Sequence, residues 1–171
     1  MSKKKILVQL DTDEHASVFD GVVAIDAGVD HLFQYAGVRP EAVRPLIHGA
    51  IFTRGPSDLQ STAIFVGGSD IELGRRVAEA ARQACFQPFT VSITHDSNGC
   101  NSTAAAAVLC AAQHVDFARV KTLVLAATGA VGQVVCRLIG LSGGAVVVGS
   151  RRMDKAEEAC RKLVERGVAS S

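Results

Sequence analysis

The chain has 171 residues, of which 48% are hydrophobic and 20% are charged, a composition that fits one ordinary domain or two small ones and not a disordered segment. Lys and Arg total 18 and Asp and Glu total 17, so the net charge is +1, and only 5% of the residues are aromatic. These values argue against a nucleic-acid binder, which needs a basic surface and stacking side chains.

The apolar segments and cysteines also argue against export and membrane insertion. The basic start is followed by an apolar run that stops at Asp11, too short for a signal peptide, and the apolar segment 104–112 is too short to span a bilayer. The five cysteines include no Cys-x-x-Cys pair, so we expect reduced, buried thiols in a cytoplasmic protein. No histidine pattern of a metal site is present, and we expect no metal.

The first part of the chain alternates β-type runs with helical stretches. We expect strands at 6–10, 62–66 and 90–94, and helices at 17–27, 70–85 and 101–112. Ser17 and Asp70 are the expected N-caps of the first two helices. The region 30–61 is interrupted by three prolines and predicts only a short helix near 41–47.

The second part predicts strands at 122–126 and 145–149, and helices at 130–141 and 154–164. The fold class is therefore α/β: an N-terminal parallel-sheet domain, 1–115, followed by the first half of a Rossmann-type domain, 116–171. Two strands alone would leave a bare sheet edge and an exposed apolar flank. Either the chain is part of a longer one, which we favour, or its second half extends the first sheet.

The stretch "VLAATGAVG" at 124–132 lies between an expected strand and an expected helix. Over it, the dinucleotide fingerprint places its three glycine positions at Ala127, Gly129 and Gly132. Gly129 would admit the pyrophosphate, Gly132 would let the helix lie close to the strand, and Ala127 fits if its φ is negative. The alternative is a tight turn without a ligand. The cofactor residues expected here are Thr128, Gly129, Ala130, Val131 and Gly132.

Ser150, Arg151 and Arg152 follow the second strand of this unit, where an NAD-binding protein has a carboxylate for the ribose hydroxyls. Guanidinium groups suit a 2′-phosphate, and a carboxylate would repel it. These three residues therefore predict NADP as the cofactor. The alternative is a solvated basic pair ahead of the helix at Asp154.

Small polar residues gather near the ends of the expected strands in the first domain, and parallel sheets bind ligands at the carboxyl ends of their strands. Ser97, Asn98 or Asn101 would alternatively serve only to cap a helix. The candidates for substrate binding are Asp11, Asp13, Ser61, Thr62, Asp96, Ser97 and Asn98.

Four segments, "MSKKKILVQLDTD", "QSTAIFVGG", "HDSNGCNSTAAAA" and "VLAATGAVG", together resemble the NADP-dependent methylene-tetrahydromethanopterin / methylene-tetrahydrofolate dehydrogenases of methylotrophic bacteria. The resemblance runs from residue 1 to about residue 160. It departs at Ala127, where the family has glycine, and the family's chains continue beyond the length present here.

The resemblance implies an enzyme of one-carbon metabolism that moves a hydride from the methylene group of a reduced pterin carrier, tetrahydromethanopterin or tetrahydrofolate, to NADP. It implies a pterin-side domain, an NADP domain and a site between them, and leaves the catalytic residues unknown. An exposed sheet edge predicts a homo-oligomer. Two other classes stay open: a non-catalytic NADP-binding module, and an oligomerisation domain that uses the small-residue helix 104–112.

Overall fold

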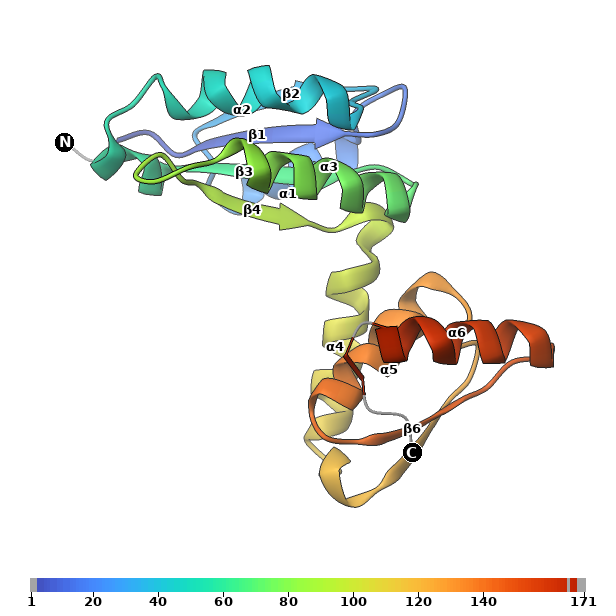
Figure 1. Cartoon of the computed structure of the whole chain (residues 1–171). Helices are drawn as coiled ribbons and strands as arrows, with labels where there is room; N and C mark the ends of the chain where they lie inside the picture. The colour runs from blue at the N-terminus through green and yellow to red at the C-terminus, as the bar shows by residue number, and fades with distance from the viewer. Residues whose placement is uncertain (1–2, 166, 169–171) are drawn as a thin grey trace. The chain divides into compact units, whose positions relative to one another are not determined.

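The structure is a computed structural model that describes residues 3–165 and 167–168. Contacts divide the chain into two compact units, Met1–Asn98 and Gly99–Ser171 (Figure 1). Helix α4, Cys100–Ala112, groups with the second unit, whereas the domains predicted from the sequence divide after residue 115.

The first unit is built on a four-stranded parallel sheet with the order β2-β1-β3-β4. In register, Ile6 pairs with Thr62 at one end of the central strands and Asp11 pairs with Gly67 at the other. Strand β2 lies in the region where the sequence predicted no strand. The strands are β1 Ile6–Asp11, β2 His31–Tyr35, β3 Thr62–Gly67 and β4 Ser92–His95.

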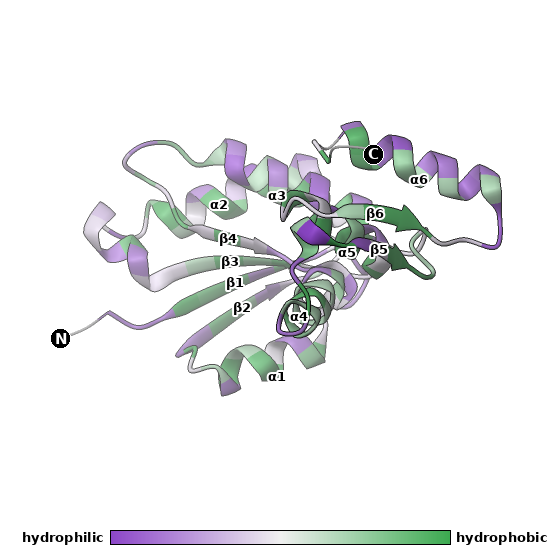
Figure 2. Cartoon of the chain, turned by 90° about the horizontal axis from the view of Figure 1, so that it is seen from below, coloured by the Kyte–Doolittle hydropathy of each residue, from purple (hydrophilic) through white to green (hydrophobic). Residues whose placement is uncertain are grey.

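Three helices cover the sheet: α1 Val18–Asp26, α2 Val43–Ile51 and α3 Ile71–Ala84. Helices α2 and α3 lie along one face and α1 along the other (Figures 1 and 2). Both predicted N-caps are confirmed, because Ser17 Oγ accepts from Asp20 N at 3.2 Å and Asp70 Oδ1 accepts from Leu73 N at 2.9 Å. Short 3₁₀ turns occupy Pro40–Ala42, Pro56–Ser61 and Ser97–Gly99.

The core of the first unit lies between the sheet and helices α2 and α3. Burial of this many aliphatic side chains is the main stabilising term for a fold of this size. Helix α1 instead leaves several large apolar side chains exposed, Phe19 among them at 76%. Core residues contributed by the sheet and both helices include Leu10, Ile47, Ile51, Ile64, Val66 and Val77.

The second unit contains a separate parallel pair of strands, β5 Lys121–Val124 and β6 Ala145–Val148, with helices α5 Ala130–Leu141 and α6 Met153–Glu165. Its two strands are hydrogen-bonded to each other in a sheet of their own. Its buried cluster is small: Ala127, Cys136, Leu163 and Val168. Strands β5 and β6 are coloured mainly as hydrophobic in Figure 2. The expected exposed apolar flank is confirmed, because Leu123 and Val147 on these strands are 59% and 38% exposed.

The cysteine prediction is only partly correct. Cys100 and Cys136 are buried and Cys85 is partly buried, but Cys110 and Cys160 are exposed. Burial raises the pKa of the Cys136 thiol to about 11. Within the described ranges, no helix is both long and apolar enough to cross a membrane, and no group of three or more His, Cys, Asp or Glu side chains could hold a metal ion.

Candidate functional site

The glycine turn follows β5 and is hydrogen-bonded to Gly149, the residue directly after β6. Ala127 N donates to Gly149 O at 3.2 Å, and Gly149 N donates to Val124 O at 2.8 Å. The left-handed residue in this turn is Ala126, with φ of +53°. Ala127 therefore has no positive φ, which is the condition under which the sequence allowed alanine at the first fingerprint position.

The remaining two glycine positions are explained by close approach. A Cβ at Gly132 would lie 2.7 Å from both Ala126 O and Ala127 Cα, which are backbone atoms that cannot give way easily. A Cβ at Gly129 would lie 3.3 Å from Ala126 O, a tighter contact than side chains normally make. Gly132 thus lets α5 begin directly against the end of β5, as the fingerprint requires.

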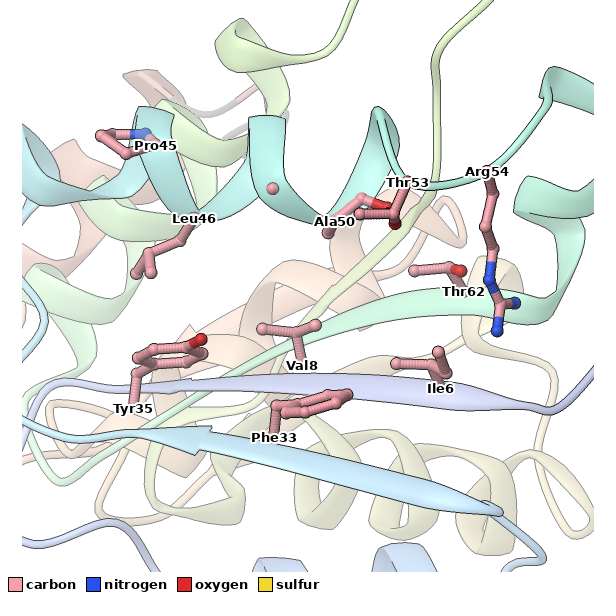
Figure 3. Close-up of a pocket in the computed structure, with 11 residues that line it drawn as sticks. Ile6, Val8, Phe33, Tyr35, Pro45, Leu46, Ala50, Thr53, Arg54 and Thr62 are labelled. Atoms are coloured by element: carbon pink, nitrogen blue, oxygen red, sulfur yellow. The ribbon is translucent and has the colours of Figure 1, made fainter.

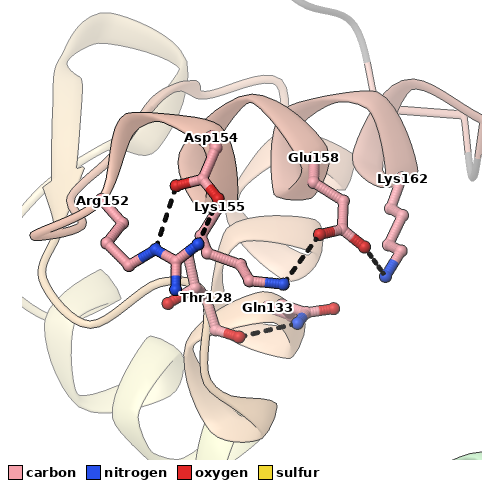
Figure 4. A network of polar contacts seen from close by, with 7 residues as sticks. All are labelled: Thr128, Gln133, Arg152, Asp154, Lys155, Glu158 and Lys162. Atoms are coloured by element: carbon pink, nitrogen blue, oxygen red, sulfur yellow. Dashed lines mark hydrogen bonds and ion pairs between the residues drawn. The ribbon is translucent and has the colours of Figure 1, made fainter.

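The start of α5 is open to an anion. Its N-cap is Gly129, and no side chain caps the helix, so the first-turn amides of Ala130 and Val131 keep the donor capacity that helix N-termini offer. The turn is held from within the helix by Gln133, whose Nε2 donates to Thr128 O at 2.9 Å (Figure 4). Sequence reasoning missed Gln133, because a single glutamine in the first turn of a helix carries no distinctive signal.

The basic loop after β6 borders the same turn. A cavity of about 600 Å³ is lined by Ala126 and Thr128 from the turn and by Ser150, Arg151 and Arg152 from the loop. Lys155, at the first turn of α6, also lines it and was not among the predicted residues. Four of the predicted cofactor residues therefore share one cavity, Thr128 from the turn and Ser150, Arg151 and Arg152 from the loop, whereas the residues at 129–132 are not among those that line it.

The two arginines differ in their partners. Arg152 Nε donates to Asp154 Oδ1 at 3.1 Å, and this pairing raises the pKa of Arg152 and lowers that of Asp154 (Figure 4). Arg151 is exposed and forms no ion pair with any residue in the described part of the chain. Arg151 is the guanidinium that is available to an added phosphate.

The carboxyl end of the first sheet carries a second polar cluster, organised by Asp11. This carboxylate is fully buried and accepts from Asp13 N at 3.0 Å, Ser17 N at 2.9 Å and Gln9 Nε2 at 3.2 Å. Gln9 Oε1 in turn accepts from Gln34 Nε2 at 2.9 Å. Asp11 therefore shapes the loop after β1 and is enclosed by protein groups.

The loops after β1 and β3 are clamped together. Asp13 Oδ1 accepts from Ser69 Oγ at 2.9 Å and both of its oxygens accept from Ser69 N at 3.0 Å. Gly68 has φ of +103°, and a Cβ there would lie 2.0 Å from Thr12 Oγ1. Only glycine suits this position, because both the backbone angle and the close contact exclude a side chain.

The segment after β4 joins the same edge. Ser97 Oγ is fully buried and donates to Gly67 O at 3.3 Å, so the 3.0 Å contact with His95 Nε2 has the histidine as donor. Burial lowers the pKa of His95, which favours the neutral imidazole with its proton on Nε2.

Asn98 adopts a left-handed conformation, with φ of 54°, and is exposed. The N-cap of α4 is Gly99, so the alternative that Ser97, Asn98 or Asn101 caps this helix is wrong.

Asp20 belongs to this cluster although the sequence did not single it out. Burial raises the pKa of its carboxyl, and the charges of Asp11 and Asp96 add to that effect. A carboxylate inside the first turn of α1 is ordinary for a helix, so sequence reasoning had no signal for it. Asp11, Asp13, Asp20 and Asp96 therefore give this edge a concentration of negative charge.

Ser61 and Thr62 lie at the other end of the sheet. They precede and open β3, whose amino end is level with Ile6, whereas Asp11 is level with the carboxyl end of β3. The structure thus brings five of the seven predicted substrate residues to one edge and leaves these two apart. Their role in substrate binding stays a prediction, and the polar cluster at the carboxyl end of the sheet does not include them.

The fold and the two sites define the class of protein: an α/β protein with a parallel four-stranded sheet and, in a second unit, a strand–glycine turn–helix that borders a basic loop. Residues 18–98 match the family described as methylene-tetrahydromethanopterin dehydrogenase, N-terminal. This match confirms the resemblance seen in the sequence over residues 18–98.

Two relatives from Methylorubrum extorquens match the chain, and the name of the second agrees with the family match. The "Bifunctional protein MdtA" is 46% identical over 165 residues, which is 95% of this chain and 57% of that protein. The "NAD(P)-dependent methylenetetrahydromethanopterin dehydrogenase" is 38% identical over 105 residues, 61% of this chain and 35% of that protein. The chain thus matches little more than half of the length of the first relative.

Proposed function

We propose that this chain is part of an oxidoreductase that transfers a hydride from the methylene group of methylene-tetrahydromethanopterin to NADP. The description of the matched family and the name of the second relative support the dehydrogenase class, and that relative's name includes NAD(P) as the cofactor. The observation that carries the choice of NADP is the exposed Arg151, without a carboxylate partner among the described residues, on the wall of the cavity at the glycine turn.

The residues at the turn fit such a cofactor. Amides at the start of α5 would hold the pyrophosphate, and Ser150 and Arg151 would hold the 2′-phosphate. Arg152, already paired with Asp154, would contribute through its charge. Bound NADP would supply the hydride acceptor. Tetrahydrofolate in place of tetrahydromethanopterin is the second carrier that the family resemblance allows.

The polar edge of the first sheet would act on the pterin side. Asn98 is exposed, and Asp13 and Asp96 are partly exposed, so these three can contact a ligand directly. Asp11 and Ser97 are fully buried and would position the loops that carry them. Loss of hydride leaves a methenyl cation, and the carboxylates of this edge would stabilise its positive charge electrostatically.

The test of the cofactor assignment is Arg151→Asp in the full chain. Loss of a guanidinium–phosphate bond and gain of a repelling charge should weaken NADP binding at least tenfold in a calorimetric titration. NAD, which lacks the 2′-phosphate, should bind the variant and the wild type about equally. Arg161→Asp, which changes charge equally on α6 outside the cavity lining, is the matched control. Unchanged NADP affinity in Arg151→Asp would refute the assignment.

A non-catalytic NADP-binding module is the second candidate, because the cavity at the glycine turn would bind the cofactor whether or not turnover follows. The two are separated by mixing the protein with methylene-tetrahydromethanopterin and NADP and following absorbance of NADPH. Formation of NADPH supports the dehydrogenase. Binding of NADP without turnover by a chain that includes the rest of the relatives' length supports the module, and binding of neither ligand supports the oligomerisation domain.

A further inference from the structure

A pocket in the first unit has no part in the function proposed above. It lies between α2 and the β1–β2 side of the sheet and has a volume of about 340 Å³ (Figure 3). Its floor is formed by Ile6, Val8 and Phe33, and α2 forms its roof. Most of the lining is apolar, which is the usual character of a small-molecule pocket of this size.

One end of the pocket holds an unsatisfied hydroxyl. Thr62 is 4% exposed, and its Oγ1 has no hydrogen-bond partner among the described residues. A buried hydroxyl without a partner is costly, and valine would fill the same space without that cost. A ligand with a hydrogen-bonding group at this end would complete the site.

The same end holds a cation without an anion. Arg54 donates to Ser61 O at 3.2 Å and to Lys4 O at 2.9 Å, both neutral carbonyls. The neighbouring cations do have carboxylates, since Lys3 pairs with Asp58 and Lys4 with Asp30. Arg54 makes no ion pair within the described part of the chain, and its remaining N–H groups match the fork of a carboxylate.

The roof of the pocket is kept open by a glycine. Gly49 lies inside α2, where glycine weakens a helix relative to alanine, and it lines the pocket. A Cβ at this position would meet nothing within 4 Å, so no packing contact requires glycine here. The absence of a side chain leaves room that a ligand could use.

The shape of the pocket is elongated. Figure 3 shows Arg54 and Thr62 at one end and Tyr35 at the other. Ile6 pairs with Thr62 and Leu10 pairs with Tyr35, so the two ends are four residues apart along β1, about 13 Å at the rise of a strand.

We propose that this pocket binds an apolar carboxylic acid, with its carboxylate on Arg54 and Thr62 and its hydrocarbon part along Val8 and Phe33 toward Tyr35. The Thr62 hydroxyl would donate to the carboxylate, and the apolar floor would gain burial from the hydrocarbon. The inference goes beyond the proposed dehydrogenase, because it uses no residue of the glycine turn or of the polar sheet edge.

The first experiment is a calorimetric titration of the full chain with decanoate, below the concentration at which it forms micelles. We expect one binding site and a ligand-dependent rise in the melting temperature. Decylamine has the same chain with the opposite charge and should not bind, because Arg54 would repel it. Equal binding of the two probes would overturn the proposal, since it would indicate adsorption to apolar surface.

Variants locate the site. Gly49→Leu should fill the pocket and weaken decanoate binding at least tenfold, while Gly49→Ala, its matched control, should strengthen the helix and preserve binding. Arg54→Gln and Thr62→Val should each weaken binding about tenfold, the size expected for a charged hydrogen bond. Phe19→Ser, on the exposed face of α1, should change nothing.

Undiminished decanoate binding by both Gly49→Leu and Arg54→Gln would refute the assignment. If Gly49→Leu does not fold, Arg54→Gln and Thr62→Val decide the question, because neither removes packing volume from the core. NADP binding should be unaffected in all of these variants, so failure here is distinguishable from failure of the dehydrogenase proposal.

Discussion

The two units of the chain differ in how much of their apolar surface they bury. In the first unit a four-stranded sheet is covered by helices, and side chains such as Leu10 and Ile47 are fully buried. In the second unit Leu123 in β5 and Leu125, the first residue after that strand, are 59% and 75% exposed. The same strand–helix alternation thus gives a complete core in one unit and a thin one in the other, because the number of strands limits how many side chains can be enclosed.

The largest expected effect tests this contrast directly. Leu10→Ala should lower the free energy of unfolding by about 2–5 kcal/mol, because it removes buried methyl groups and leaves a cavity. Leu125→Ala should change it by less than about 0.5 kcal/mol, because the side chain is already exposed. Urea denaturation of both variants measures the difference. Similar losses would show that Leu125 is buried in solution by something that covers the second sheet.

A smaller effect is expected from the glycine turn. Gly132→Ala should destabilise the second unit by about 1–3 kcal/mol, because the new Cβ would press on backbone atoms at 2.7 Å. Gly129→Ala, with one contact at 3.3 Å, should cost less. Hydrogen exchange resolved by segment should show faster exchange in α5 and unchanged exchange in β1 and β3. Equal protection in the two variants would contradict the packing role of Gly132.

The smallest effect concerns pH in the first unit. Burial lowers the pKa of His95, the charges of Arg82 and Arg75 act in the same direction, and Asp96 opposes them. The unfolded chain then binds the proton more readily than the folded one, so His95 lowers stability as pH falls below about 6.5 and stops doing so below its folded pKa.

The measurement for His95 is the melting temperature of wild type and His95→Gln between pH 7.5 and pH 5. The wild type should lose more stability on acidification than the variant, which has no proton to bind there. Parallel curves would show that His95 does not contribute to the pH dependence, since the other histidines are present in both proteins.

Much of the fold could be predicted from the sequence, and the exceptions have physical causes. The caps at Ser17 and Asp70 follow from local chemistry and were predicted correctly. Strand β2 was missed, because its sequence "HLFQY" forms a sheet edge with mostly exposed residues and lacks a buried run. Ser61 and Thr62 border a strand in sequence, but polar residues before a parallel strand lie at the end opposite to those that follow one.

Some features of the two candidate sites could likewise be predicted from the sequence, and others could not. The glycine turn and the basic loop are short motifs with fixed geometry, so their proximity around one cavity could be anticipated. The positive φ of Ala126, the support of the turn by Gln133 and the enclosure of Asp11 depend on contacts between segments that no local pattern encodes.

The contact between Gly68 and Thr12 has a consequence for protein engineering. With no room for even a methyl group and a backbone angle that side chains avoid, a saturation library at position 68 should return glycine alone among folded clones. Directed evolution of the neighbouring loops therefore has to leave this residue unchanged and vary exposed positions such as Glu14 and His15 in the loop after β1.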